Sequence, residues 1–355
     1  MPISSALGSS ALLPAGLGFR NLLINGGMGI NQRNTTITSN GYTLYTVDRW
    51  YVDHGTSGGR SIAANSDVPT GSGFTSSLRI TATTGATSGG SLPLFGQRIE
   101  LANCANLAYG SVSAKTVTIS FWVKATVVGT YAVKLKANST YLAPYTILAS
   151  NVWEKKTLTI AGDTSGAISS YLDVQFCFGG SSGFWGTSNS WVSSTSAYAT
   201  SGQVDAMETT GNIFAITGVQ LEQNYQPTSF EQRPIGVELA LCQRYYWRMN
   251  GQSAGYNRIP STGSSFGGTS WQGVISFPLT MRAKPTSIDS SGIGCTDNVS
   301  FDSASFTSVL LNANNSHESG AFITTSGGSG INSGAGQILI LRGGATAYLG
   351  LSAEL

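Results

Sequence analysis

Charged residues are scarce in this sequence. Only 10% of its 355 residues are Asp, Glu, Lys or Arg, whereas a typical soluble protein has about 25%. The 19 basic and 17 acidic residues nearly cancel, which leaves a net charge of +2. Such a chain has no field that gathers phosphates, and we therefore expect no nucleic-acid partner.

Histidine is nearly absent, which limits the chemistry available to the chain. A Ser or Cys nucleophile needs a base, and only His54 and His317 are present. The segments 55–59 and 179–183 match the GxSxG pattern of hydrolases, but a chain rich in Gly and Ser gives such matches by chance. His54 has no second histidine or HExxH motif near it, so we interpret it as a turn residue at a strand end.

Paired carboxylates, as in glycoside hydrolases, would have to come from 17 scattered acids. The candidates are Glu100, Glu222, Glu231 and Glu238. Their surroundings indicate structural roles, because Glu222 closes an expected strand and Glu231 adjoins Arg233 as a local ion pair. We expect a protein that is not an enzyme, with no catalytic residues; a glycan-cleaving enzyme is the alternative.

Cysteine is rare and widely spaced. Cys104, Cys177, Cys242 and Cys295 form no CxxC pair, so the sequence offers no start of a zinc or redox site. Their density is too low for a disulfide scaffold, and we interpret all four as free and buried. We expect no cofactor and no metal site from these residues. Whether loop oxygen atoms hold a metal stays open, because such sites need no short motif.

No apolar run approaches the 18 residues of a membrane span, and we expect no membrane insertion. Residues 1–18 carry no charge, and their apolar stretch is broken by Ser, Pro and Gly, so they lack the features of a secretory signal. We interpret residues 1–18 as an arm that docks on another surface. A frayed tail is an equally open alternative.

What the sequence does contain is period-two alternation of apolar and polar residues. Val117, Ile119, Phe121 and Val123 share one parity, and the segment 131–136 alternates in the same way. These two segments are predicted to be strands that pair as an antiparallel hairpin. Further strands are expected at 158–160, 172–178 and 219–221, separated by turn-forming clusters; the chain has 45 glycines. Short strands at this spacing are typical of a sandwich or jelly roll.

One helix is expected, from Pro234 to Trp247, with Pro234 in its first turn and Leu239, Cys242 and Tyr246 on one face. The sequence therefore predicts an all-β protein in which a short helix, 234–247, joins two β-sandwich or jelly-roll domains. The first domain spans 19–233 and the second spans 248–355. No heptads and no fixed-period repeat occur, which excludes a coiled-coil shaft, a β-helix and a propeller.

Aromatic residues in a polar loop are the best lead to a binding site. Trp185, Trp191 and Tyr198 fall in a stretch rich in Ser, Thr and Asn between expected strands. Exposed aromatic faces beside hydroxyl and amide groups are what sugar rings stack upon, so we predict these three as ligand-binding residues. The alternative is that they cover the end of the sandwich or form a subunit interface.

Several motifs resemble, in order, those of a family of bacteriophage tail-fibre or virion structural proteins. They are Phe19 to Arg33, Tyr45 to Trp50, Ile119 to Ala125, Gly218 to Glu222, Phe230 to Pro234, Glu238 to Tyr246, Phe277 to Thr286 and Ala353 to Leu355. The first domain of that family is similar to the galactose-binding-like jelly rolls of carbohydrate-binding modules. Its aromatic sugar platform has no clear counterpart here, so the resemblance does not carry over sugar binding.

The resemblance implies a virion component assembled in the cytoplasm of a bacterial host. The expected function is a tail fibre or fibre tip that recognises the host surface; the alternative is a capsid decoration or head appendage protein with a structural role. The implied partners are other virion proteins of the tail or capsid, further copies of the chain in a homotrimer, and a host-surface glycan. Similar domains serve several of these roles, because a fold does not fix a function.

Overall fold

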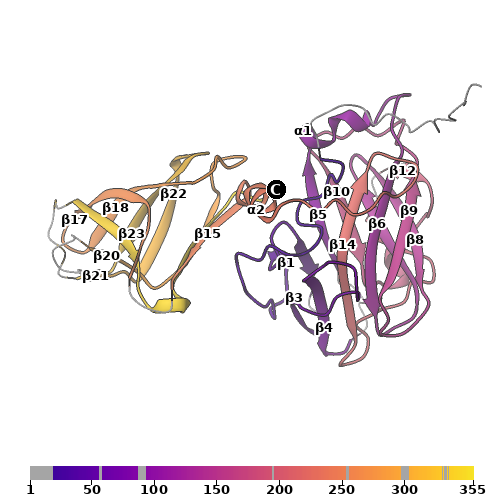
Figure 1. Cartoon of the computed structure of the whole chain (residues 1–355), viewed down its shortest axis with the longest axis horizontal. Coiled ribbons are helices and arrows are strands. Elements are labelled where there is room, and N and C mark those ends of the chain that lie inside the picture. Colours follow the sequence, from indigo (N-terminus) through magenta and orange to yellow (C-terminus); the bar gives the residue numbers. More distant parts are fainter. Residues whose placement is uncertain are drawn as a thin grey trace, which may run out of the picture.

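The fold is all-β, as predicted. The computed structural model describes residues 19–55, 58–86, 93–193, 196–252, 256–296, 304–329, 331, 334 and 336–355. In these residues two bodies of β-sheet lie on either side of a short helix (Figure 1). The expected docking arm, 1–18, lies outside the described residues, as does the serine of the first GxSxG match. No helix among the described residues is long and apolar enough to cross a membrane.

The N-terminal body is a sandwich of two antiparallel sheets. The seven-stranded sheet has the order β1 (Gly41–Tyr45), β2 (Tyr51–His54), β5 (Leu94–Glu100), β10 (Tyr171–Cys177), β7 (Gly129–Lys136), β8 (Ser139–Ile147) and β12 (Trp191–Ser193). The five-stranded sheet has the order β3 (Gly59–Asn65), β4 (Ser77–Thr84), β14 (Ile213–Glu222), β6 (Val117–Ala125) and β9 (Glu154–Ile160). After β5 the chain makes two short turns of helix, α1 (Leu101–Cys104) and η1 (Ala105–Leu107).

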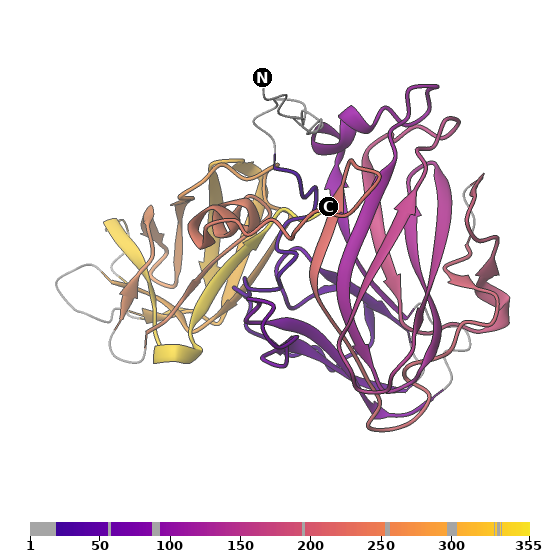
Figure 2. The ribbon, with the colours of Figure 1, turned by 45° about the vertical axis from the view of Figure 1, so that its right-hand side comes forward.

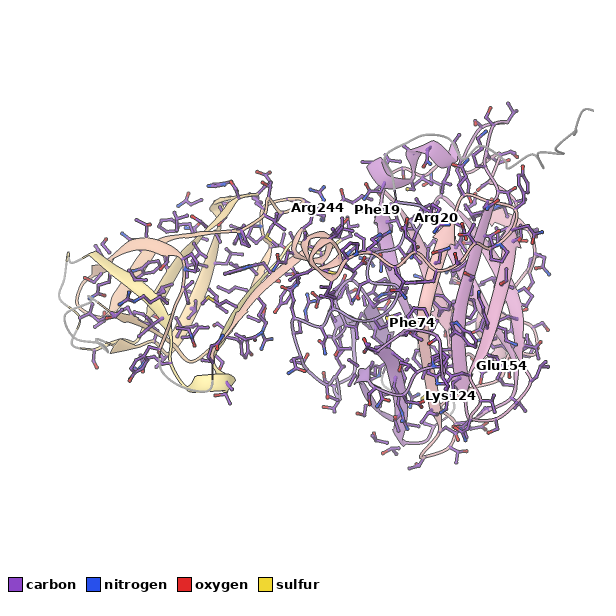
Figure 3. The ribbon with its side chains drawn as sticks, viewed as in Figure 1. Phe19, Arg20, Phe74, Lys124, Glu154 and Arg244 are labelled. Atoms are coloured by element: carbon purple, nitrogen blue, oxygen red, sulfur yellow. The ribbon has the colours of Figure 1, made fainter. Side chains whose placement is uncertain are left out.

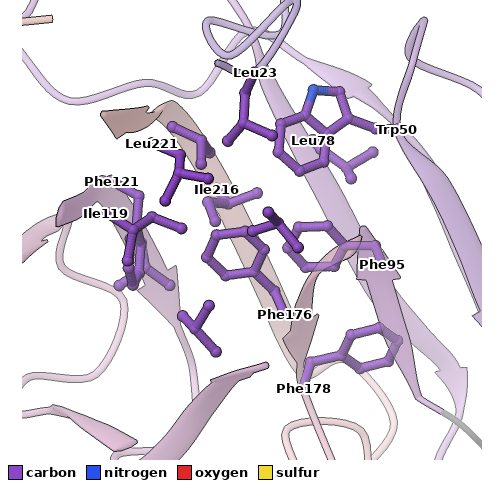
Figure 4. Packing of buried hydrophobic residues seen from close by; sticks show 14 of the residues in the cluster. Leu23, Trp50, Leu78, Phe95, Ile119, Phe121, Phe176, Phe178, Ile216 and Leu221 are labelled. Carbon is purple, nitrogen blue, oxygen red and sulfur yellow. The ribbon is translucent and has the colours of Figure 1, made fainter. Parts of the chain in front are cut away.

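The space between these two sheets is filled mainly by aromatic and branched side chains (Figure 4). Phe95 and Phe176 stack with ring centroids 5.1 Å apart, and Phe121 meets Phe176 edge to face at 5.0 Å. Trp50 lies beside the same pair and is fully buried. The apolar parity recognised in the sequence therefore faces this core, because alternate side chains of a strand point to the same sheet face.

The expected hairpin between 117–123 and 131–136 is wrong. Both segments are strands, but β6 pairs with β14 and β9, whereas β7 pairs with β10 and β8. The chain crosses from one sheet to the other between Ala125 and Gly129. Alternation shows which residues face the core but not which neighbour a strand pairs with, since both sheets of a sandwich share that core.

The C-terminal body is also built from antiparallel sheets. A three-stranded sheet has the order β15 (Tyr246–Asn250), β25 (Tyr348–Ser352) and β19 (Ser287–Ser291). A larger sheet has the order β21 (Ala304–Ser305), β20 (Ile293–Thr296), β24 (Gly336–Leu341), β17 (Ser261–Phe266), β18 (Ser270–Ser276), β23 (Gly320–Ser326) and β22 (Ser308–His317), with β16 (Asn257–Arg258) paired to β24. A turn of helix, η3 (Gly344–Thr346), separates β24 from β25. Trp271, Ile323 and Leu339 lie in the core of the C-terminal body.

The connecting helix, α2 (Ile235–Gln243), is shorter than the expected span of 234–247. Pro234 is the residue that precedes the helix rather than a member of its first turn. Tyr246 and Trp247, expected in the helix, instead form β15 and pair with β25. Aromatic residues favour strands over helices where a partner strand is available, and only the folded chain brings β25 to this position.

The two bodies meet at a junction that contains several of the motifs behind the family resemblance. Segments 19–33, 45–50, 238–246, 277–286 and 353–355 converge there. In Figure 3, Arg244 lies beside α2 at this junction, and it is bonded to Glu100 of the N-terminal body at 3.1 Å. These motifs therefore hold the two bodies together, which is a structural role.

The four cysteines are free and buried, as predicted. Burial raises the pKa of Cys177 to about 12 and that of Cys104 to about 11. Thiols with such pKa values are almost wholly protonated at neutral pH and are poor nucleophiles. They act as small core side chains.

Candidate functional site

The outer face of the seven-stranded sheet is covered in part by the segment from Gly179 to Asp205, of which residues 179–193 and 196–205 are described. This segment contains η2 (Ser182–Phe184), β11 (Trp185–Gly186) and β13 (Ala199–Thr200), and β11 pairs with β13 in parallel. Figure 2 shows it, in pink, at the right-hand side of the sandwich. Tyr198 and Ala199 form a buried cluster with Tyr51, Leu94 and Cys177 of the sheet. We call residues 179–205 the covering segment.

Tyr198 is one of the three aromatic residues predicted to bind a ligand, and that prediction is wrong for its ring face. Its side chain is 0% exposed, and its ring stacks on Phe184 at 4.6 Å between centroids. The ring fixes the covering segment to the sheet. The sequence did not show this, because the segment looks like a polar loop until the sheet face beneath it is known.

Trp191 is also used for packing. Its indole lies against Tyr109 and Tyr141, with ring centroids 5.4 and 5.3 Å away, and Nε1 donates a hydrogen bond of 2.7 Å to the carbonyl of Ala161. It belongs to the edge of the core of the sandwich. For Trp191 and Tyr198 the structure therefore matches the alternative interpretation, in which the aromatic residues cover the sandwich.

Trp185 is the most exposed of the three, since Trp191 is partly buried and Tyr198 is fully buried. Trp185 is 39% exposed and lies at a groove of about 250 Å³ between the covering segment and strand β8. The groove is lined by Thr140, Leu142, Gly183, Trp185, Gly186, Thr187, Val192, Ser196 and Ala197. An exposed indole beside three side-chain hydroxyls combines an apolar face with hydrogen-bonding groups.

Two details show that this groove is shaped by specific residues. A Cβ atom on Gly186 would lie 2.5 Å from Cβ of Ala197. Only glycine at position 186 therefore allows these two parts of the covering segment to lie this close together. The hydroxyl of Thr140 is buried and has no hydrogen-bond partner among the described residues. Buried hydroxyls normally have a partner, so this oxygen is available to a bound group.

Two lysines lie next to the groove on the same sheet face. In the register of β7 with β8, Lys136 is opposite Thr140 and Lys134 is opposite Leu142. Burial lowers the pKa of Lys134, which is 5% exposed. Sequence reasoning missed these two residues because they are some fifty positions before Trp185, although their alternation already placed them on the solvent-facing side of a strand.

The acids considered for catalysis have structural partners. Arg233 binds both Glu231, at 3.1 Å, and Glu238, at 3.3 Å. Glu222 accepts hydrogen bonds from the amide and the hydroxyl of Thr228 at 2.8 Å, and Glu100 is paired with Arg244. Among the described residues, no group of three His, Cys, Asp or Glu side chains is arranged to hold a metal.

The two histidines lie apart, in different bodies. His54 is the last residue of β2, as expected of a residue at a strand end, and it is buried. His317 is the last residue of β22, and its Nδ1 lies 3.0 Å from the hydroxyl of Ser319. Neither histidine lines the Trp185 groove, so a base for a nucleophile is missing from it.

The junction contains a larger cavity, of about 470 Å³. The guanidinium of Arg33 lies 3.5 Å from the ring centre of Tyr246 and 3.8 Å from the carboxylate of Glu354. Arg248 is 3.7 Å from the carboxylate of Asp289. The charged groups of this cavity are paired with one another and are not free to bind a ligand. We therefore take the Trp185 groove as the candidate site.

No protein-family model and no curated protein matches this chain. Solved structures similar to part of the chain include the enzymatically active domain of tailspike protein 4 of bacteriophage CBA120, with 14% identity over 58% of this chain and 22% of that one, and a TM-score of 0.34. A family 4 carbohydrate-binding module has 19% identity over 56% of this chain and 98% of its own, and a TM-score of 0.31. The family 11 carbohydrate-binding module of a Clostridium thermocellum cellulosomal cellulase has 13% identity over 54% of this chain and 98% of its own, and a TM-score of 0.28. At these scores the likenesses bear on neither site nor function.

Proposed function

We propose that this chain is a bacteriophage virion protein, a tail fibre or fibre tip, that binds a glycan of the host surface in the Trp185 groove. The observation that supports glycan binding is the partly exposed indole of Trp185 at a groove that is also lined by Thr140, Thr187 and Ser196. The apolar face of a sugar ring stacks on an indole, while its hydroxyls exchange hydrogen bonds with side-chain hydroxyls. The virion assignment is supported by the ordered sequence motifs.

The groove supports binding without catalysis. None of its lining residues is Asp, Glu, His, Cys or Lys. Hydrolysis of a glycoside requires an acid and a base or nucleophile on either side of the bond, and among the described residues the groove offers neither. A ligand would therefore be held and released unchanged.

Replacement of Trp185 by Ala tests this proposal. We expect the variant to lose about tenfold or more in affinity for the host surface, because a partly exposed aromatic anchor is the type of residue that dominates a binding interface. The measurement is competition: purified protein is added to host cells, and the adsorption of intact phage is followed. Tyr225→Ala is the matched control, since Tyr225 is 72% exposed and follows β14 in the other sheet. Equal competition by Trp185→Ala and wild type would refute binding at the groove.

A second candidate function is structural, in a capsid decoration or head appendage protein whose role rests on contacts between subunits, and one surface is suited to such a contact. The outer face of the larger C-terminal sheet has cross-strand rows without a charged residue. One row is Thr262, Val274, Phe322 and Asn312; the next is Ser264, Gln272, Thr324 and Leu310. Leu310 is 58% exposed and Val274 36%. We propose further copies of this chain as the occupant, because two uncharged faces meet without like-charge repulsion or unpaired buried charge.

Leu310→Lys tests this second function. A lysine there would have to be desolvated at the contact, so we expect the variant to be monomeric at concentrations where the wild type is oligomeric. Light scattering coupled to size-exclusion chromatography measures the mass. Leu148→Lys is the control, since Leu148 is 77% exposed in the N-terminal body. A wild type that is monomeric throughout, or an oligomer unaffected by Leu310→Lys, would remove the support for this surface.

A further inference from the structure

We propose that the ligand of the Trp185 groove is an acidic glycan, a saccharide with carboxylate groups, and that Lys134 and Lys136 provide the positive charge that selects it. This inference rests on the proposed function of the groove. It adds the charge of the ligand, which the aromatic residue alone does not specify.

The first step is the position of the two lysines. Thr140 and Leu142 of β8 line the groove, and the residues directly opposite them on β7 are Lys136 and Lys134. Directly opposed residues in an antiparallel pair have Cβ atoms about 5 Å apart on the same face. The side chains of both lysines therefore start beside the floor of the groove, one row away from the residues that form it.

The second step is that neither ammonium group is in a close ion pair, although Asp173 lies near enough to interact with both charges. Within the described residues, neither Lys134 nor Lys136 has a carboxylate oxygen within 4.0 Å, whereas Lys124 and Lys156 both have one. Lys134 is 5% exposed, and burial lowers its pKa. Burial of most of this side chain makes its positive charge costly, and an anion that binds beside it lowers that cost.

The third step concerns the nearest acid, Asp173, which is opposite Lys136 in the pairing of β10 with β7. Its oxygens accept hydrogen bonds of 2.9 Å from the hydroxyl of Tyr51 and from the amide of Gln175, and Nε of Arg98 is 3.7 Å away. Asp173 is thus held by partners on the far side of β7 from the groove. The groove side has two cations and no carboxylate among its lining residues.

The fourth step is the hydroxyl of Thr140, which is buried without a hydrogen-bond partner among the described residues and is opposite Lys136. A hydroxyl donor next to an ammonium group forms a pair suited to a carboxylate, because hydrogen bonds to charged acceptors are stronger than those between neutral groups. Trp185 would stack on the sugar ring, and the Lys136 ammonium and Thr140 hydroxyl would bind its carboxylate group.

The test compares each polysaccharide with a neutral form of itself. The probes are bacterial capsular polysaccharides that contain uronic acids, and the same polymers after reduction of their carboxyl groups to alcohols. Binding of the full chain is measured by biolayer interferometry at low and high salt. We expect carboxyl reduction to weaken binding about tenfold and high salt to weaken binding only of the acidic form, because exposed charge pairs are screened.

The variants are Lys136→Gln and Lys134→Gln, with Lys155→Gln as control, because Lys155 is exposed on β9 of the other sheet. We expect the first two variants to bind the acidic polymer about fivefold or more weakly and the reduced polymer with little change. The reason is that each substitution removes one charge of an interacting pair. Thermal melting of each variant shows whether it is folded; if Lys134→Gln is not, Lys136→Gln decides the outcome alone.

The two proposals fail in different ways. If the acidic and reduced polymers bind equally and Trp185→Ala weakens both, the groove binds glycans and the inference about acidity is wrong. If Trp185→Ala leaves binding of the acidic polymer unchanged, or if no polymer binds, the proposed function itself is wrong and the inference fails with it. Loss of acidic-polymer binding in Lys155→Gln equal to that in Lys136→Gln would also overturn the inference, since the charge would then act at long range.

Discussion

Replacement of Arg49 by Ala is expected to lower the free energy of unfolding by about 3 to 5 kcal/mol, the cost of leaving one member of a buried ion pair unpaired. Arg49 lies between β1 and β2, and its side chain is 2% exposed. Its guanidinium binds the carboxylate of Glu354 and donates a hydrogen bond of 2.7 Å to the carbonyl of Arg98. It also lies 3.4 Å from the ring centre of Tyr245. One side chain thus connects the N-terminal body to Tyr245 and Glu354 on the other side of the junction.

The physical reason for a large effect is what the substitution leaves behind. The side chain of Glu354 is 6% exposed, and its remaining cation, Arg33, is 3.8 Å away. A carboxylate in that position keeps its desolvation cost but loses its strongest partner. The aliphatic part of Arg49 also packs in the junction, so its removal leaves a cavity.

Chemical unfolding with intrinsic tryptophan fluorescence measures the change. The double-mutant cycle of Arg49→Ala and Glu354→Ala isolates the pair, and we expect the double variant to be less destabilised than the sum of the single variants. Arg258→Ala is the control for loss of an exposed arginine on β16. If Arg49→Ala lowers the free energy of unfolding by less than about 1 kcal/mol, which is the range of surface ion pairs, the Arg49–Glu354 pair does not act as a buried ion pair.

Gly26→Ala is expected to have an effect of similar size, a loss of at least about 3 kcal/mol, because the added methyl group has no space. A Cβ atom on Gly26 would lie 2.0 Å from the carbonyl oxygen of Val219. The carbonyl of Gly26 accepts a hydrogen bond of 2.9 Å from the amide of Val219, so the two backbones cannot separate without loss of this bond. The side chain of Asn21 fixes the same contact, since it donates to the carbonyl of Val219 at 3.0 Å.

Gly29→Ala is the matched control, because Gly29 belongs to the same sequence motif and a Cβ atom added to it would meet no other atom within 4 Å. We expect a change within about 0.5 kcal/mol for it, as for a surface substitution. The melting temperatures of the two variants are compared by circular dichroism. If Gly26→Ala has the same melting temperature as Gly29→Ala, the close approach of residues 25–27 to β14 is not needed for stability.

These two sites give a physical explanation for motifs that the sequence showed only as a resemblance. Gly26 is needed where the N-terminal segment passes the backbone of β14, and Arg49 and Glu354 are needed where the two bodies meet. Residues far apart in the chain are joined by a small number of charged and hydrogen-bonded contacts. A motif of this kind has a structural role and leaves the ligand unspecified.

Of the residues that line the candidate groove, the sequence indicated Trp185. Among the three aromatic residues, the sequence pattern was the same for each: a large ring in a polar stretch. The structure separates them, because Tyr198 meets Phe184 over the sheet, Trp191 meets Tyr141, and Trp185 is left at the groove. Exposure of a ring depends on what the rest of the chain places against it, and this is a tertiary property.

The sequence by itself determined the all-β class, five strands of the N-terminal body (β6, β7, β9, β10 and β14), the free and buried state of the cysteines, and the presence of a helix after Pro234. Each follows from local pattern, composition or spacing, which act over a few residues. Only the tertiary structure decided that β6 and β7 belong to opposite sheets, that the helix ends at Gln243, and that Lys136 lies beside the groove of Trp185. These depend on pairing between distant segments, where many partners satisfy the same alternation and the choice is made by packing of the whole core.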